Sequence, residues 1–104
     1  MGMQYDVKAS APRTSDGQMQ DAAAANNLER TRIKTIYGIS GTTAGSVKFY
    51  NGTSASDPLI ITVNTPAAAN SGTFWLPLPG EGLLAENGVY LDITDAASVM
   101  IIYG

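Results

Sequence analysis

The sequence contains no cysteine and no histidine. The first absence excludes disulfide bonds and thiol nucleophiles, and the second excludes acid–base mechanisms that depend on an imidazole. Together they also exclude the usual zinc ligand sets. Charged side chains are scarce as well, because they make up 14% of the 104 residues against about 25% in an average soluble domain. The composition therefore argues against most classes of enzyme, in a chain long enough for one small domain.

Paired carboxylates are the remaining catalytic option. Asp92 and Asp95 flank two residues, and Glu81 and Glu86 lie in neighbouring turns. Glycosidases need two carboxyl groups at a defined separation, and they hold them in a cleft lined by aromatic side chains. A single tryptophan and carboxylates in turns do not fit that requirement, so we expect no enzyme and no cofactor. A calcium site at Asp92 and Asp95 is the other interpretation of the same residues, with a weak ligand spacing.

The charge is distributed unevenly along the chain. The net charge is −3, which argues against a nucleic-acid partner. Residues 1–48 hold all six basic residues, including Arg30 and Arg32, whereas residues 49–104 hold five acidic residues and no basic one. One interpretation is an ordinary surface dipole. The other is that the basic segment of one copy meets the acidic face of the next. The longest apolar runs are far shorter than the roughly 20 residues that span a bilayer, so no membrane partner is expected.

The first 27 residues are predicted to form an extended N-terminal arm. Residues 9–27 contain no aromatic residue, no β-branched aliphatic residue and no leucine, so they cannot bury enough apolar area to offset the entropy of ordering. A helical turn is expected at residues 21–25, where Asp21 precedes four alanines. The alternation of Met3, Tyr5 and Val7 with polar residues predicts a short strand at 3–8 that adds to a sheet edge. We therefore expect the arm to order only in an assembly, with Tyr5 and Val7 at the contact.

From residue 28 to residue 104 the pattern is one of short strands separated by turns. Strands are predicted at residues 30–39, 46–50, 59–63, 73–78, 83–85, 89–94 and 98–103. Val47 and Phe49 are expected to point inward, a bulge is expected at Ile36–Tyr37, and Pro77 indicates an edge strand. The fold class is therefore all-β: a small antiparallel β-sandwich or jelly-roll-like barrel of six to seven strands, in a domain of residues 28–104 preceded by the arm.

Three of these strands, 59–63, 73–78 and 98–103, carry apolar residues on both faces. In a monomeric sandwich one face of each strand would be wet. Ile60, Trp75, Met100 and Ile102 are therefore candidate contacts between copies, because burial would remove an exposed apolar patch. The alternative is that the sandwich curls and encloses these residues itself. Arg30 and Arg32 are candidate contacts through their charge.

The order of the turns and strands resembles that of small virion structural proteins of tailed bacteriophages, particularly marine ones. The segments that carry the resemblance are RTRIKTIY at 30–37, AGSVKFYNG at 44–52, LPLPGEG at 76–82 and the final VMIIYG at 99–104. The resemblance implies a non-enzymatic piece of the virion, such as a capsid decoration or cement protein. Its expected partners are further copies of itself, as a homotrimer, and the major capsid protein or other virion proteins.

Two other locations in the particle fit the same segments. The chain could be a tail, baseplate or fibre-associated module rather than a head protein. In that case a host-receptor glycan is the expected ligand, bound by Tyr50 and by the loop residues Asn51, Thr53 and Ser54.

Overall fold

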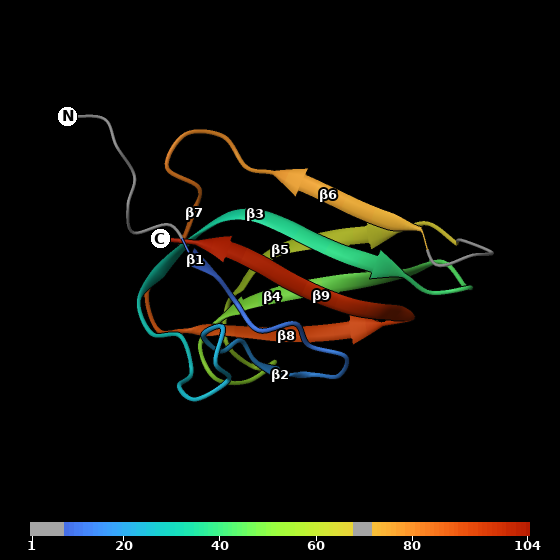
Figure 1. The fold of residues 1–104 in the computed structure, drawn as a ribbon. Helices are drawn as coiled ribbons and strands as arrows, with labels where there is room; N and C mark the ends of the chain where they lie inside the picture. The colour runs from blue at the N-terminus through green and yellow to red at the C-terminus, as the bar shows by residue number, and fades with distance from the viewer. Residues whose placement is uncertain (1–7, 68–71) are drawn as a thin grey trace.

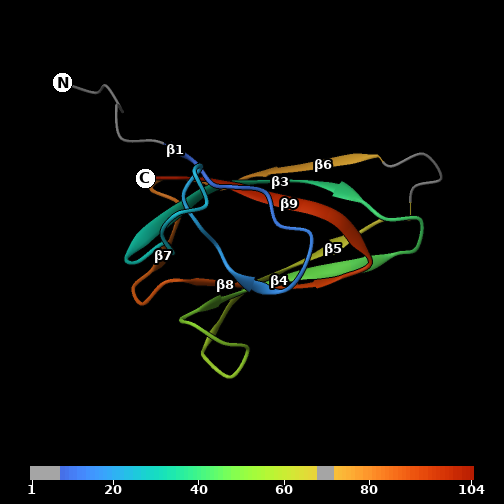
Figure 2. The same ribbon diagram turned by 60° about the horizontal axis from the view of Figure 1, so that its bottom comes forward.

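The computed structural model describes residues 8–67 and 72–104. These residues form two packed antiparallel sheets, and none of the described connections between strands contains a helix. The β3 sheet has the order β1-β9-β3-β6, with β7 also pairing with β3, and the β4 sheet has the order β2-β8-β4-β5. Figures 1 and 2 show the two layers from two directions. The strands are β1 (Lys8–Ala9), β2 (Gly17–Gln18), β3 (Thr31–Ser40), β4 (Gly45–Asn51), β5 (Leu59–Thr65), β6 (Thr73–Pro77), β7 (Leu83–Ala85), β8 (Val89–Thr94) and β9 (Ala96–Tyr103).

The predicted all-β sandwich is confirmed, but the strand count of six to seven is wrong. The structure has nine strands in its described part, of which β3 to β9 match the seven predicted segments to within two residues at each end. The two additional strands, β1 and β2, have two residues each and lie in the region predicted to be an arm. The predicted edge position of Pro77 is confirmed, because β6 ends the β3 sheet. The described residues contain no helix long and apolar enough to cross a bilayer.

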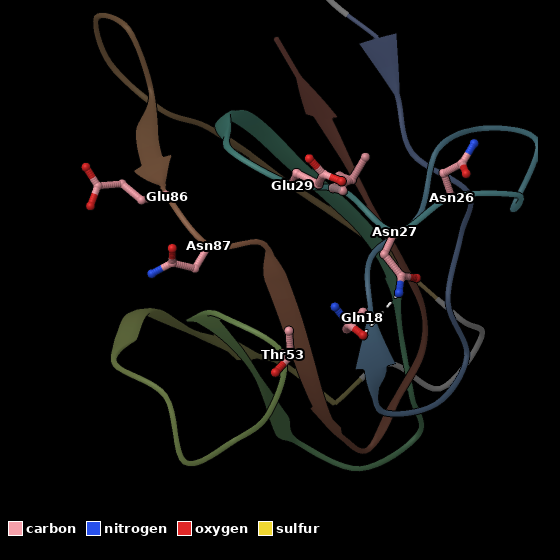
Figure 3. A pocket seen from close by; sticks show the side chains of 8 residues that line it. Gln18, Asn26, Asn27, Glu29, Thr53, Glu86 and Asn87 are labelled. Atoms are coloured by element: carbon pink, nitrogen blue, oxygen red, sulfur yellow. Dashed lines mark hydrogen bonds between the residues drawn. The ribbon is translucent and has the colours of Figure 1, made fainter.

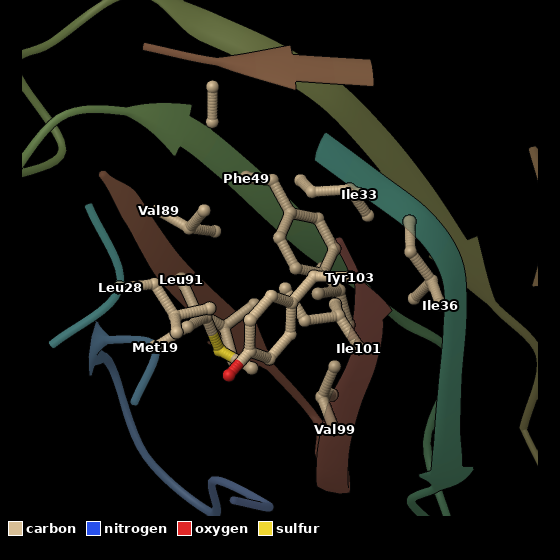
Figure 4. Close-up of a cluster of buried hydrophobic side chains, with 12 residues drawn as sticks. Met19, Leu28, Ile33, Ile36, Phe49, Val89, Leu91, Val99, Ile101 and Tyr103 are labelled. Carbon is tan, nitrogen blue, oxygen red and sulfur yellow. The ribbon is translucent and has the colours of Figure 1, made fainter. Parts of the chain in front are cut away.

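Alternating side chains of the two sheets fill the space between the layers. Val47 and Phe49 of β4 are completely buried, as their alternation with polar neighbours predicts. Figure 4 shows the cluster that these strands enclose. Its buried members are Met19, Leu28, Ile33, Ile36, Val47, Phe49, Ala85, Val89, Leu91, Val99, Ile101 and Tyr103.

The bulge in β3 lies earlier than predicted. The pairing of β3 with β9 shifts between Ile33 and Thr35, not at Ile36–Tyr37. The physical reason is that Ile33 and Ile36 are both buried although they are three residues apart, so one extra residue must stand between them. Gly38 has a different role, because a Cβ atom there would overlap the ring of Phe74 and the backbone of β9.

The arm is expected to order only in an assembly, whereas residues 8–27 pair with both sheets of their own chain. These residues, which we name the strap, hydrogen-bond to both sheets. Ser10 donates its backbone N–H to the carbonyl of Ile101 at 2.8 Å, and Arg13 and Val99 exchange two backbone hydrogen bonds. Further along, Gly17 and Gln18 pair with β8 in the other sheet. Figure 2 shows the chain passing from β1 in one layer to β2 in the other. The strap therefore closes one side of the sandwich.

Met19 explains why the strap is held. Its side chain is completely buried, and Figure 4 shows it in the cluster beside the labelled Leu28 and Leu91. The absence of aromatic, leucine and β-branched aliphatic residues predicted an unanchored segment, but an unbranched methionine fills an irregular gap as well as these do. The predicted strand at 3–8 lies outside the described residues except for Lys8. This residue belongs to β1 and pairs with Tyr103 of β9.

A tight turn replaces the predicted helical turn at residues 21–25. Ala24 donates its backbone N–H to the Asp21 carbonyl at 2.8 Å, and its φ of 55° is incompatible with continuing a right-handed helix. One carboxylate oxygen of Asp21 accepts hydrogen bonds from the backbone N–H groups of Ala25 and Asn26 at 3.0 and 3.4 Å. These bonds lower the pKa of Asp21, the bond from Ala25 most strongly.

Candidate functional site

The outer face of the β3 sheet carries an uncharged and largely apolar surface. Tyr37 of β3 lies directly across the ladder from Trp75 of β6 on one side and from Met100 of β9 on the other. Trp75 is 69% exposed and Tyr37 is 38% exposed. The neighbouring rows extend the surface in both directions along the strands. We name the whole the Trp75 face, and its members are Thr35, Tyr37, Ile39, Thr73, Trp75, Pro77, Ser98, Met100 and Ile102.

Three of the predicted contact residues meet on this face: Trp75, Met100 and Ile102. Their convergence follows from the antiparallel register, because Met100 shares a row with Trp75, and Ile102 lies in the next row opposite Thr35. Met100 and Ile102 are half-buried. The sequence patterns missed Tyr37 as a member of the face. Its signal in the sequence is that it directly follows the buried Ile36, because successive residues of a strand point to opposite faces. This signal can be used only once the bulge is placed between Ile33 and Thr35.

Ile60 does not belong to the Trp75 face. It lies in β5 of the opposite sheet, where the register shifts between Phe49 and Tyr50, which pair with Ile61 and Leu59. Ile60 is thus the extra residue of a bulge, and it packs against the core cluster. Ile60 and the Trp75 face therefore lie in different sheets.

The predicted basic contacts lie beyond one end of the face. Arg32 is half-buried in β3 opposite Leu84 and exchanges two backbone hydrogen bonds with Gly104, each 3.1 Å long. Arg30 is exposed and immediately precedes β3. Tyr5 and Val7 lie outside the described residues.

A polar pocket of about 460 Å³ lies where three chain segments meet. Figure 3 shows its lining side chains. They come from the end of the strap and the residues after it, from the loop after β4, and from the turn between β7 and β8. The lining residues are Gln18, Asn26, Asn27, Leu28, Glu29, Thr53, Glu86 and Asn87.

Two hydrogen bonds join the loop after β4 to the turn between β7 and β8. The side-chain oxygen of Asn51 accepts from the backbone N–H of Asn87 at 2.8 Å, and Gly52 donates its N–H to the carbonyl of Gly88 at 3.1 Å. Gly88 has a φ of 110°, and a Cβ atom there would lie 3.1 Å from the carbonyl oxygen of Leu28 and 3.2 Å from that of Gly52. Only glycine fits this junction. Asn51, predicted to be free for a glycan, is therefore used to position Asn87.

The carboxylates considered for catalysis or calcium binding are dispersed. Asp92 faces the same side of the sheet as its cross-strand neighbour Lys48, and Asp95 occupies the turn after β8 with a φ of 57°. Within residues 8–67 and 72–104, no three side chains of the histidine, cysteine, aspartate and glutamate types lie close enough together to hold a metal ion. No family model matches the chain, and neither a curated protein nor a solved structure matches it.

Proposed function

We propose that the chain is a non-enzymatic structural protein of a tailed-phage virion, and that it is a capsid decoration or cement protein. The proposal combines the resemblance of residues 30–37, 44–52, 76–82 and 99–104 with one structural observation. That observation is the row of Trp75, Tyr37 and Met100 on the outside of the β3 sheet. An apolar face of this kind is costly to leave in water and is typical of a contact with another protein.

The proposed occupant of the Trp75 face is a second copy of the same chain, within a homotrimer. None of the nine residues of the face is charged. Copies related by rotation bring the same residues together near the symmetry axis, where like charges would repel. An uncharged face avoids this cost. A face that binds one particular charged partner would instead carry charges of the sign opposite to that partner's.

The trimer would present its remaining surface to the major capsid protein. Since residues 8–27 complete their own sandwich, we assign the particle contact mainly to the β-domain. Tyr5 and Val7, which precede the strap, are the candidate contact residues outside it. Arg30 and Arg32 are also proposed to contact the particle. They lie at the end of the β3 sheet, where the chain leaves the strap.

Two measurements test the proposal. Sedimentation equilibrium of the purified full chain at micromolar concentration should give the mass of a trimer, and a monodisperse monomer would contradict the oligomer. An antibody against the chain, applied to particles of the phage that encodes it, should label the head in electron micrographs. Label confined to the tail or baseplate would support the tail-module alternative, and unlabelled particles would contradict a virion role.

A further inference from the structure

We infer that the polar pocket lined by Gln18, Asn27, Glu86 and Asn87 is a binding site for a neutral saccharide. This inference does not depend on the proposed virion role, because it rests on residues outside the Trp75 face. The site shares Thr53 and the neighbouring Tyr50 with the glycan surface predicted from the sequence, but Asn51 is used to position Asn87 and the carboxamides are new.

The lining chemistry selects the ligand class. Four carboxamides, one hydroxyl and two carboxylates line the pocket, and its lining contains no basic side chain. A carboxamide offers two donor and two acceptor positions, which matches the hydroxyl groups of a sugar, each both donor and acceptor. Anionic ligands lack a counter-charge here. A cation would need six or more oxygen ligands for calcium, and no cluster of three acidic side chains is present among the described residues.

Two of the four carboxamides, those of Gln18 and Asn27, are already held in place. Asn27 donates to the side-chain oxygen of Gln18 at 3.1 Å, a bond that Figure 3 marks, and accepts from the side chain of Gln20 at 3.1 Å. Within residues 8–67 and 72–104 these bonds use one of the four positions on Gln18 and two on Asn27. The remaining positions are available to a ligand, and the fixed orientation reduces the entropy lost on binding.

An aromatic row begins directly beside the pocket. Gln18 is the cross-strand neighbour of Tyr90, which pairs with Tyr50, which in turn pairs with Leu59. The rings of Tyr50 and Tyr90 are in edge contact, with centroids 6.3 Å apart. Tyrosine offers an apolar body and a polar hydroxyl, so this row extends the site along the outer face of the β4 sheet. A chain of sugar units has a surface to follow, and the pocket volume lies within the range of small-molecule sites.

The test is a titration of the full chain, labelled with nitrogen-15, with glucose, galactose, mannose and N-acetylglucosamine. At least one sugar should shift the side-chain amide signals of Gln18, Asn27 and Asn87. Asn87→Ala removes a side chain whose backbone N–H, not its carboxamide, holds the turn, so it should weaken binding about tenfold without unfolding the domain. Glu86→Gln is the second variant, since it keeps the shape of the side chain. Asn64→Ala, at an exposed position in β5, is the matched control and should leave binding unchanged.

Three outcomes would overturn the inference, and a fourth would identify the source of the saccharide. If none of the four sugars shifts these signals, and no neutral glycan on an array is retained, the pocket is not a saccharide site. If calcium chloride alone shifts the same signals, it is a cation site. Equal binding by wild type and Asn87→Ala would place the ligand elsewhere. Tighter binding of an arrayed oligosaccharide than of its monosaccharide would identify surface glycans, rather than free sugars, as the source.

Discussion

Met19 donates its backbone N–H to the carbonyl of Val89 at 2.8 Å while its side chain is completely buried in the core. The backbone of Met19 thus joins the strap to β8, and the side chain of Met19 joins it to the core cluster between the two layers. This relationship makes residues 8–27 part of the folding unit, and the domain of this chain starts before residue 28.

Met19→Ala is predicted to destabilise the domain by about 2–5 kcal/mol, because it removes a fully buried side chain and leaves a cavity. The measurement is urea unfolding of the purified chain followed by tryptophan fluorescence. Met19→Leu keeps the volume and should cost less than about 1.5 kcal/mol. A change below about 0.5 kcal/mol for Met19→Ala, typical of surface substitutions, would show that the strap does not contribute to the core.

The sequence was sufficient to predict seven strands because each alternates or ends at a clear turn signal. Val47 and Phe49 in β4, and Val89 and Leu91 in β8, repeat with a period of two and are all buried. The strap could not be recognised in this way. Its strands have two residues each, its one core side chain is Met19, and its strands pair with residues about 70 to 95 positions away.

The candidate surfaces were predictable to different extents. Trp75, Met100 and Ile102 were identified from apolar residues on both faces of a strand, yet which of these residues share a face depends on the register. One bulge placed Ile60 in the opposite sheet against the core cluster, and another brought Tyr37 outward. The polar pocket has no local sequence signal, because Gln18, Thr53 and Asn87 come together only through the junction at Gly88.

The turn at Asp21 predicts a pH dependence of stability. The pKa of Asp21 is lowered below its ordinary value of 3.8 by the backbone N–H groups of Ala25 and Asn26. A lowered pKa in the folded state means that the carboxylate contributes stability that is complete above the unfolded-state pKa and is lost as the pH falls through the folded-state pKa.

Asp21→Ala should therefore lower the melting temperature at neutral pH, and the difference from wild type should shrink as the pH falls below 3.8. The measurement is a series of thermal melts across that range. Glu81→Gln, which removes an exposed carboxylate from the turn after β6, is the control for the loss of one charge. A difference between Asp21→Ala and wild type that is constant with pH would contradict the role of the carboxylate.

Gly88 is predicted to be irreplaceable at the junction behind the pocket. Gly88→Asn should destabilise the domain by more than about 1 kcal/mol, because its φ of 110° lies outside the left-handed region that asparagine tolerates. Gly80→Asn is the matched control, since Gly80 has a φ of 61° and open space around its missing Cβ. Chemical denaturation of both variants provides the comparison, and equal stability losses would refute a special constraint at Gly88.

Trp75 is predicted to matter for association and not for the stability of one chain. Because its side chain is 69% exposed, Trp75→Thr should change the free energy of unfolding of a dilute sample by no more than about 0.5 kcal/mol. The same substitution removes the largest apolar side chain of the Trp75 face, so it should weaken self-association by about tenfold or more. Sedimentation velocity over a concentration series measures the association, with thermal melts at the lowest concentration for stability.

Leu59→Thr is the control for the Trp75 variant, because Leu59, at 52% exposed, is the other strongly exposed large apolar residue among residues 8–67 and 72–104 and lies in the opposite sheet. If association uses the Trp75 face, Leu59→Thr leaves the sedimentation profile unchanged. If Leu59→Thr dissociates the oligomer and Trp75→Thr does not, the copies meet through the β4 sheet. The Trp75 face would then be free for another protein of the particle, and the assignment of its occupant made above would be wrong.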